Sequence, residues 1–259
     1  MNRFYVMLCL VVGWQTATAQ PLTPAQIFAK TIAVYESAAT YQDTGEAVTS
    51  IKQGNAAWYE PETITFRTTF QTAFIRQAAQ YTLRYTRLPY SGRSEKCSLI
   101  WARGAETKTW LDIHKKIETP ARLEDALGLS WGVPAEAVKR VYSLLMNTSS
   151  SDWGLNELKD ISVLPPDKVL NRSCYHLRGT LNRDVFGHVT AKAPRPIKGP
   201  TERHPAIEVW IDATTFLILR VTEAYNQGVD YRSKTINYQP VLNQPVKPEA
   251  LAFDYKNCQ

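Results

Sequence analysis

The segment from Ile207 to Val221 constrains the fold of this 259-residue chain more than any other. Two mostly apolar, β-branched runs, 207–211 and 216–221, flank the short polar segment Asp212-Ala213-Thr214-Thr215. Two such runs around a short polar turn are typical of a β-hairpin. The segment contains no nucleophile paired with a base, no metal-ligand spacing and no phosphate-binding loop. We therefore interpret it as the centre of a curved antiparallel sheet.

The rest of the chain predicts one helix, a run of strands, a helical insertion and more strands. Thr23-Pro24-Ala25-Gln26 has the capping-box pattern of a helix N-terminus, and the apolar positions that follow repeat at helical spacing. From Tyr41 the apolar period changes to two, which favours strands. Strands are expected at 41–52, 64–74, 81–85, 97–102, 107–113, 158–164, 168–181 and 231–238, with a short pairing at 251–253.

Two helices, 121–129 and about 138–145, are predicted between the two sets of strands. This insertion either lies as a plug across the concave face of the sheet or packs ordinarily on the core. The proline-rich segment 187–205 is interpreted as an extended loop of unassigned role. No linker divides the chain, so residues 20–259 are predicted to form a single domain.

Residues 1–19 are predicted to be a secretory signal peptide. A short basic start precedes an apolar run that is too short to span a bilayer, and Ala17-Thr18-Ala19 fits a cleavage site. The alternative is an N-terminal membrane anchor. The net charge of +6 is scattered along the chain, so no nucleic-acid partner is expected. The basic surface is either simply solvated or makes peripheral contact with an anionic membrane.

Cleavage after Ala19 would remove Cys9 and leave Cys97, Cys174 and Cys258. An oxidising compartment permits one disulfide among three cysteines. We favour Cys174 with Cys258, since both lie in the C-terminal half. No cysteine or histidine spacing indicates a metal site, and no cofactor is expected.

The sequence offers weak candidates for catalysis. Asp112 and His114 lie two apart on a predicted strand, but a metal needs further ligands. Glu118, Glu124 and Asp125 lie near the predicted helical insertion and are interpreted as solvated charges. We therefore expect no enzymatic activity.

Aromatic residues are the most informative chemistry, because many fall on predicted strands. A single curved sheet has two faces, and one helix cannot cover a wide one, so surplus apolar surface needs a ligand, a partner or a plug. A well-packed core is the alternative. The candidate residues for an apolar ligand cavity, from the strands and the second inserted helix, are Phe66, Phe70, Phe74, Tyr81, Leu83, Tyr85, Trp101, Trp110, Val141, Leu144 and Leu145. Trp210 and Phe216 are interpreted as residues that shape a concave wall.

The order of these elements resembles the LolA/LolB-like superfamily, which contains periplasmic lipoprotein carriers and envelope sensors. The hairpin segment Val209–Leu217 and the ending Val246–Phe253 carry the resemblance. More closely, Ser98–Trp101, Lys108–Ile113 and Cys174–Gly179 resemble an uncharacterised branch of secreted bacterial proteins. The similarity covers roughly Thr23 to Phe253. No residue matches the functional arginine of the carriers.

The resemblance implies an α+β fold in which a strongly curved antiparallel sheet, a half-open barrel, is covered by helices on its concave face. It implies a periplasmic or secreted protein that binds or carries a lipid-like or acylated ligand, such as a lipoprotein. The alternative is an envelope sensor or protein-interaction module without lipid transport, whose partners are envelope proteins. The oligomeric state, the ligand and the choice between transport and sensing stay open.

Overall fold

The computed structural model describes residues 21–52, 63–88, 96–129, 133–146, 155, 158–181, 206–227 and 230–258. The predicted signal peptide and the proline-rich segment 187–205 lie outside the described residues, and so does Cys9. No helix of the described part is both long and apolar enough to cross a membrane.

Twelve antiparallel strands form one open sheet with the order β6-β5-β4-β3-β2-β1-β11-β10-β9-β8-β7, and β12 pairs with β1 beside this path. The strands are β1 (Thr40–Lys52), β2 (Thr63–Ile75), β3 (Gln80–Arg87), β4 (Lys96–Arg103), β5 (Glu106–Leu111), β6 (Lys116–Glu118), β7 (Leu158–Val169), β8 (Arg172–Leu181), β9 (Ala206–Asp212), β10 (Ile218–Gln227), β11 (Asp230–Tyr238) and β12 (Val241–Leu242).

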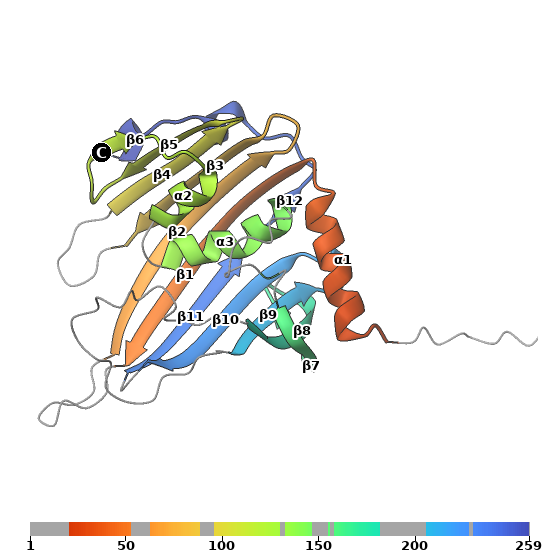
Figure 1. The fold of residues 1–259 in the computed structure, drawn as a ribbon. Helices are drawn as coiled ribbons and strands as arrows, with labels where there is room; N and C mark the ends of the chain where they lie inside the picture. The colour runs from red at the N-terminus through yellow and green to blue at the C-terminus, as the bar shows by residue number, and fades with distance from the viewer. Residues whose placement is uncertain are drawn as a thin grey trace, which may run out of the picture.

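Helices cover one face of this sheet, which we call the inner face. They are α1 (Pro24–Glu36), α2 (Leu123–Leu129) and α3 (Val133–Met146). In Figure 1 the helices α2 and α3 cross the curved sheet, and α1 stands at the side of β9, β10 and β12. The α+β class and the curved, open antiparallel sheet are therefore confirmed.

The local signals for α1 and for the central hairpin are confirmed. The Thr23 hydroxyl accepts from the Gln26 backbone N–H, and the Gln26 side chain accepts from the Thr23 backbone. In the hairpin, one oxygen of Asp212 accepts from the backbone N–H groups of Thr214 (3.1 Å) and Thr215 (2.6 Å). Burial alone would raise the pKa of Asp212, but hydrogen bonds from Thr215 and Arg172 lower it. β10 begins only at Ile218, because Phe216 has a left-handed φ of 58°.

Several predicted strand boundaries were wrong, and the largest differences are at β7, β8 and the C-terminal segment. The strand expected at 168–181 is split by a turn at Leu170 and Asn171, both with positive φ (52° and 61°), so β7 runs on to Val169. Pairing with β8 is irregular between Leu164 and Asp167, because the two intervening prolines have no N–H to donate. The pairing expected at 251–253 is absent from the described structure; the short strand is β12, and η2 (Pro248–Leu251) follows it.

The chain beyond β12 lies on the outer face, opposite the helices. Trp101 Nε1 donates to the carbonyl of Leu251 (2.8 Å), and Arg84 Nη2 donates to the carbonyl of Asp254 (3.2 Å). A disulfide between Cys97 and Cys258 then joins β4 to η3 (Lys256–Cys258), across 161 residues of sequence. The predicted Cys174–Cys258 pair was therefore wrong. Since this tail folds back onto β4, proximity in sequence is a poor guide to cysteine pairing.

Cysteine mapping under non-reducing conditions is expected to yield a linked pair of peptides containing Cys97 and Cys258. Cys174 is the free, buried cysteine of the described residues. It is expected to resist a thiol reagent in the native protein and to react fully in denaturant, as measured by peptide mass spectrometry. A linked peptide that contains Cys174 would contradict this assignment.

Candidate functional site

Eight of the eleven predicted cavity residues meet on the inner face. Alternate residues of a strand point to opposite faces, so one parity of β2 and of β3 faces the helices. The apolar side of α3 lies against them. These eight belong to one buried cluster: Phe70, Phe74, Tyr81, Leu83, Tyr85, Val141, Leu144 and Leu145.

The other three do not join this cluster. Phe66 lies nearer the start of β2 and is only partly buried. Trp101 and Trp110 point to the outer face, where the C-terminal tail covers them; the Trp110 ring lies 5.1 Å from that of Tyr255. Trp210 also lies on the outer face, in a small cluster with Cys174, so it does not shape the concave wall. Phe216 packs against the main core.

Beneath α3 the inner face is filled by the protein's own side chains. Among the described residues, the cavity beneath α3 has a volume of about 10 Å³ and is lined by Tyr81, Val141, Tyr142 and others. Packing is close even at the backbone: a Cβ on Gly45 would lie 2.2 Å from the ring of Phe70. The interpretation of the insertion as a plug therefore fits α3, which occupies the space that a ligand would need.

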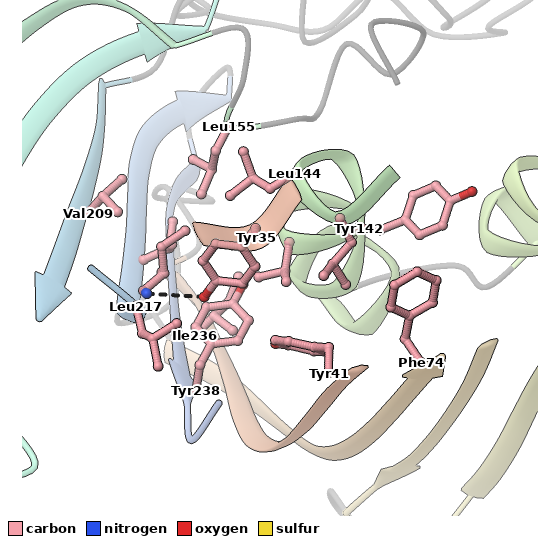
Figure 2. Packing of buried hydrophobic residues seen from close by; sticks show 14 of the residues in the cluster. Tyr35, Tyr41, Phe74, Tyr142, Leu144, Leu155, Val209, Leu217, Ile236 and Tyr238 are labelled. Atoms are coloured by element: carbon pink, nitrogen blue, oxygen red, sulfur yellow. Dashed lines mark hydrogen bonds between the residues drawn. The ribbon is translucent and has the colours of Figure 1, made fainter. Parts of the chain in front are cut away.

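A layer of tyrosines lies between the helices and the middle of the sheet, with Tyr35 contributed by α1, Tyr41 by β1 and Tyr238 by β11. Figure 2 shows Tyr35, Tyr41 and Tyr238 gathered beneath Leu144 of α3. The Tyr35 hydroxyl accepts from the backbone N–H of Ile218 (3.1 Å), which fixes α1 to the start of β10. Burial raises the pKa of each of these three tyrosines. They are therefore neutral hydrogen-bonding groups within an apolar layer.

Asp43 is a buried carboxyl group in this layer that the sequence analysis did not identify. It is 4% exposed, accepts from the Tyr41 hydroxyl (2.9 Å) and accepts from the Gln239 backbone N–H (2.7 Å). Burial raises its pKa from 3.8 to about 7, against these hydrogen bonds, which favour the charged form. A local signal existed, because Asp43 occupies an inward position of β1 between Tyr41 and Gly45.

A second unforeseen feature is a fully buried ion pair that connects α3 to the sheet. Arg140 Nη2 lies 2.8 Å from a carboxylate oxygen of Glu223 on β10, and each side chain is 1% exposed. Lys234, opposite Glu223 on β11, lies 4.0 Å from the same oxygen. Nε and Nη1 of Arg140 meet no hydrogen-bond acceptor among the described residues. Such unmet donors are costly in a buried place, so this contact holds α3 less firmly than apolar packing of the same size would.

The weaker catalytic candidates do not form a common site. His114 contacts Glu118 (3.3 Å), Glu124 accepts from the Tyr142 hydroxyl (2.9 Å), and Asp125 pairs with Arg122 (3.2 Å). In the described part of the chain, no three His, Cys, Asp or Glu side chains are grouped so as to hold a metal ion.

No protein-family model matches the sequence, and no curated protein sequence matches it. Among solved structures, this chain is similar to the lipoprotein LppX of Mycobacterium tuberculosis, with 8% identity, a TM-score of 0.44, and 86% of this chain and 97% of that chain covered. LprF from Mycobacterium bovis gives 10% identity, a TM-score of 0.44, and coverage of 86% and 94%. A proposed outer membrane lipoprotein-sorting protein domain from Vibrio parahaemolyticus gives 12% identity, a TM-score of 0.37, and coverage of 91% and 97%. At these values the similarities concern the general course of the chain and say nothing about ligands.

Proposed function

We propose that this protein binds the acyl chain of a lipid-like or acylated ligand on its inner face, in the cell envelope, after α3 moves aside. The observation that carries this proposal is the position of α3. The helix covers a broad apolar surface built by β1, β2, β3 and β11, and it is fastened to the sheet by the under-satisfied ion pair of Arg140 and Glu223. A plug held in this way is easier to displace than one held by apolar contacts alone.

The first test is to purify the mature chain from the cell envelope, extract it with organic solvent and analyse the extract by mass spectrometry. A co-purifying acylated compound in about stoichiometric amount is expected. An empty protein that also fails to bind fluorescent fatty acids would contradict lipid binding. A stable protein partner in a pull-down, without lipid, would favour the alternative of an envelope sensor or interaction module.

A sharper prediction concerns Arg140→Gln, which removes the ion pair and leaves Glu223 beside Lys234. In the closed state, α3 covers the inner face, and an acyl chain must compete with it. Destabilising this closed state by about 1–2 kcal/mol is expected to raise the apparent affinity for a fluorescent fatty acid by about 5- to 30-fold. The matched control is Arg122→Gln, just before α2, because Arg122 forms an exposed pair with Asp125 whose side chains are 72% and 45% accessible. Circular dichroism confirms that both variants are folded. Unchanged or lower affinity of Arg140→Gln would contradict the displacement of α3.

A further inference from the structure

A groove on the outer face of the described structure lies outside the proposed lipid site. Its volume is about 530 Å³, within the range that small-molecule sites occupy. It is lined mainly by polar side chains, among them Thr44, Gln71, Arg84, Arg220 and Asn237. These residues alternate along their strands with the inner-face residues, so the groove and the packed core lie on opposite sides of one sheet.

Strand register arranges the floor of this groove as rows that run across the sheet. Arg84 pairs with Gln71, which pairs with Thr44. In the next row, Asn237 of β11 lies between Glu46 of β1 and Arg220 of β10. β3 and β10 are four strands apart in the sheet order, so the floor extends about 19 Å along the sheet. Hydroxyl and amide groups in the middle supply both hydrogen-bond donors and acceptors.

The two ends of the rows are cationic. Arg84 uses one nitrogen on the Asp254 carbonyl, and Arg220 uses Nε on the Asn237 amide oxygen (2.8 Å) while its guanidinium lies 5.7 Å from the ring centre of Trp210. Each guanidinium therefore keeps further N–H donors. The acid of the groove, Glu46, is bonded to Arg67 (3.0 Å) and so contributes little net negative charge.

The groove has a wall that is held in place before any ligand arrives. A neighbouring cavity of about 310 Å³ shares Gln71 and Arg84 with it and is bounded by Lys247 and Glu249 of the tail. The tail is anchored near this point by the hydrogen bond from Trp101 to Leu251 and, further on, by the Cys97–Cys258 disulfide. A fixed wall lowers the ordering cost of binding.

We propose that this outer groove binds an oxygen-rich anionic ligand, a polyol that carries a phosphate or carboxylate group. Arginine forms paired hydrogen bonds with these groups, and the hydroxyl and amide floor suits the polyol. Such a ligand has two possible sources: a free phosphorylated or acidic sugar-like compound, or the headgroup of an anionic lipid. The chemistry is the same in both, and the arginines of the groove lie on the face opposite the proposed acyl site.

Binding is tested by isothermal titration and by ¹H–¹⁵N NMR with glycerol 3-phosphate, glucuronate and, as the neutral comparison, glucose. Vesicles of phosphatidylglycerol, with phosphatidylcholine vesicles as control, distinguish a lipid headgroup from a free ligand. Arg84→Gln and Arg220→Gln are each expected to weaken binding of the anionic probe about 10-fold or more, as loss of a charge-assisted hydrogen bond predicts. Arg122→Gln, just before α2, is expected to leave binding unchanged.

Arg84 also holds the tail, so a third variant separates binding from folding. Asn237→Asp places a carboxylate beside Arg220 and is expected to abolish anion binding while it keeps a partner for Arg220. The proposal is overturned if no anionic probe or vesicle binds at millimolar concentration, if glucose binds as well as the anions, or if the three groove variants bind as the wild type does. Fatty-acid binding by Arg84→Gln is expected to be normal, so failure here is distinct from failure of the acyl-site proposal.

Discussion

Replacing Glu223 with leucine is expected to lower the free energy of unfolding by about 3–5 kcal/mol, because it leaves Arg140 buried without its carboxylate. Both side chains are 1% exposed, so water cannot replace the lost partner. Arg140 already has two nitrogens without an acceptor in the described structure, and the substitution would remove the acceptor of its third. The measurement is urea unfolding at pH 7, followed by tryptophan fluorescence.

The arginine side of the pair is expected to be less sensitive. Arg140→Met leaves Glu223 close to Lys234, at 4.0 Å, so one charge of the opposite sign remains nearby. The double variant Arg140→Met/Glu223→Leu is expected to be more stable than Glu223→Leu alone, because no guanidinium is then stranded. Glu46→Gln is the exposed control; its pair with Arg67 is largely accessible and is expected to contribute less than about 1 kcal/mol.

Two outcomes would contradict this account of the ion pair. Glu223→Leu could unfold with the same midpoint and slope as Glu46→Gln, which would mean that Arg140 finds another partner or reaches water. Alternatively, the double variant could be no more stable than Glu223→Leu, which would mean that the cost arises from Lys234 or from packing on β10 and not from the arginine of α3.

Most of the fold was predictable because its signals are local. The capping box at Thr23 sets the start of α1, and the change from helical to period-two spacing near Tyr41 sets the start of β1. The polar turn at Asp212 sets the central hairpin. The errors came where a single backbone conformation decides a boundary, as at Leu170, whose positive φ ends β7.

The facing of the tryptophans was not predictable from strand pattern alone. On β4 the side chains are apolar on both faces of the sheet: Ile100 faces the helices, whereas Leu99 and Trp101 face outward. Both faces of β4 are covered, the inner one by helices and the outer one by the tail. Apolar and polar residues therefore do not alternate along this strand, and the sequence does not show which residues face the helices. The tail's position also decides the disulfide with Cys97, and no local pattern encodes it.

Of the two buried polar features of the inner face, one was predictable from the sequence and the other was not. Asp43 lies among the residues of β1 whose side chains face the helices. Its burial could therefore have been predicted from the alternation of side chains along the strand. The pair of Arg140 and Glu223 joins residues 83 positions apart on a helix and a strand, and neither has a local feature that distinguishes it from a surface charge. Contacts of this kind follow from tertiary packing alone.

The aspartate gives the second large prediction: the contribution of Asp43 to the stability of the wild type is expected to be lost as the pH rises from about 4 to about 7. The pKa of Asp43 is 3.8 in its ordinary state and about 7 in the folded protein, where burial raises it. Between these values the unfolded chain releases a proton that the folded protein keeps. Between pH 3.8 and about 7 the folded state therefore binds more protons than the unfolded state. The contribution of Asp43 to stability is complete below pH 3.8 and is lost as the pH rises to about 7. The full interval corresponds to about 4 kcal/mol.

Asp43→Asn is expected to remove this dependence. The asparagine side chain has no proton to lose, its oxygen can accept from the Gln239 N–H, and its NH₂ group can donate to the Tyr41 hydroxyl. The variant is therefore expected to match the wild type below about pH 3.8 and to exceed its stability by about 4 kcal/mol at pH 8. Urea unfolding at intervals of pH gives both curves.

Other carboxyl groups titrate in the opposite sense, so the difference between the two proteins at each pH is the informative quantity. The pKa values of Asp167 and Asp212 are both lowered in the folded state. For Asp167 the main cause is the hydrogen bond from the Lys168 backbone N–H. For Asp212, burial acts to raise the pKa, but the hydrogen bonds from Thr215 and Arg172 outweigh it. These groups contribute equally to both proteins and cancel in the difference. Asp125→Asn, at an exposed position on α2, is the matched control and is expected to follow the wild-type curve. Parallel curves for Asp43→Asn and the wild type would show that Asp43 is ionised in the folded protein across this range, and that the inner face holds a buried negative charge beneath α3.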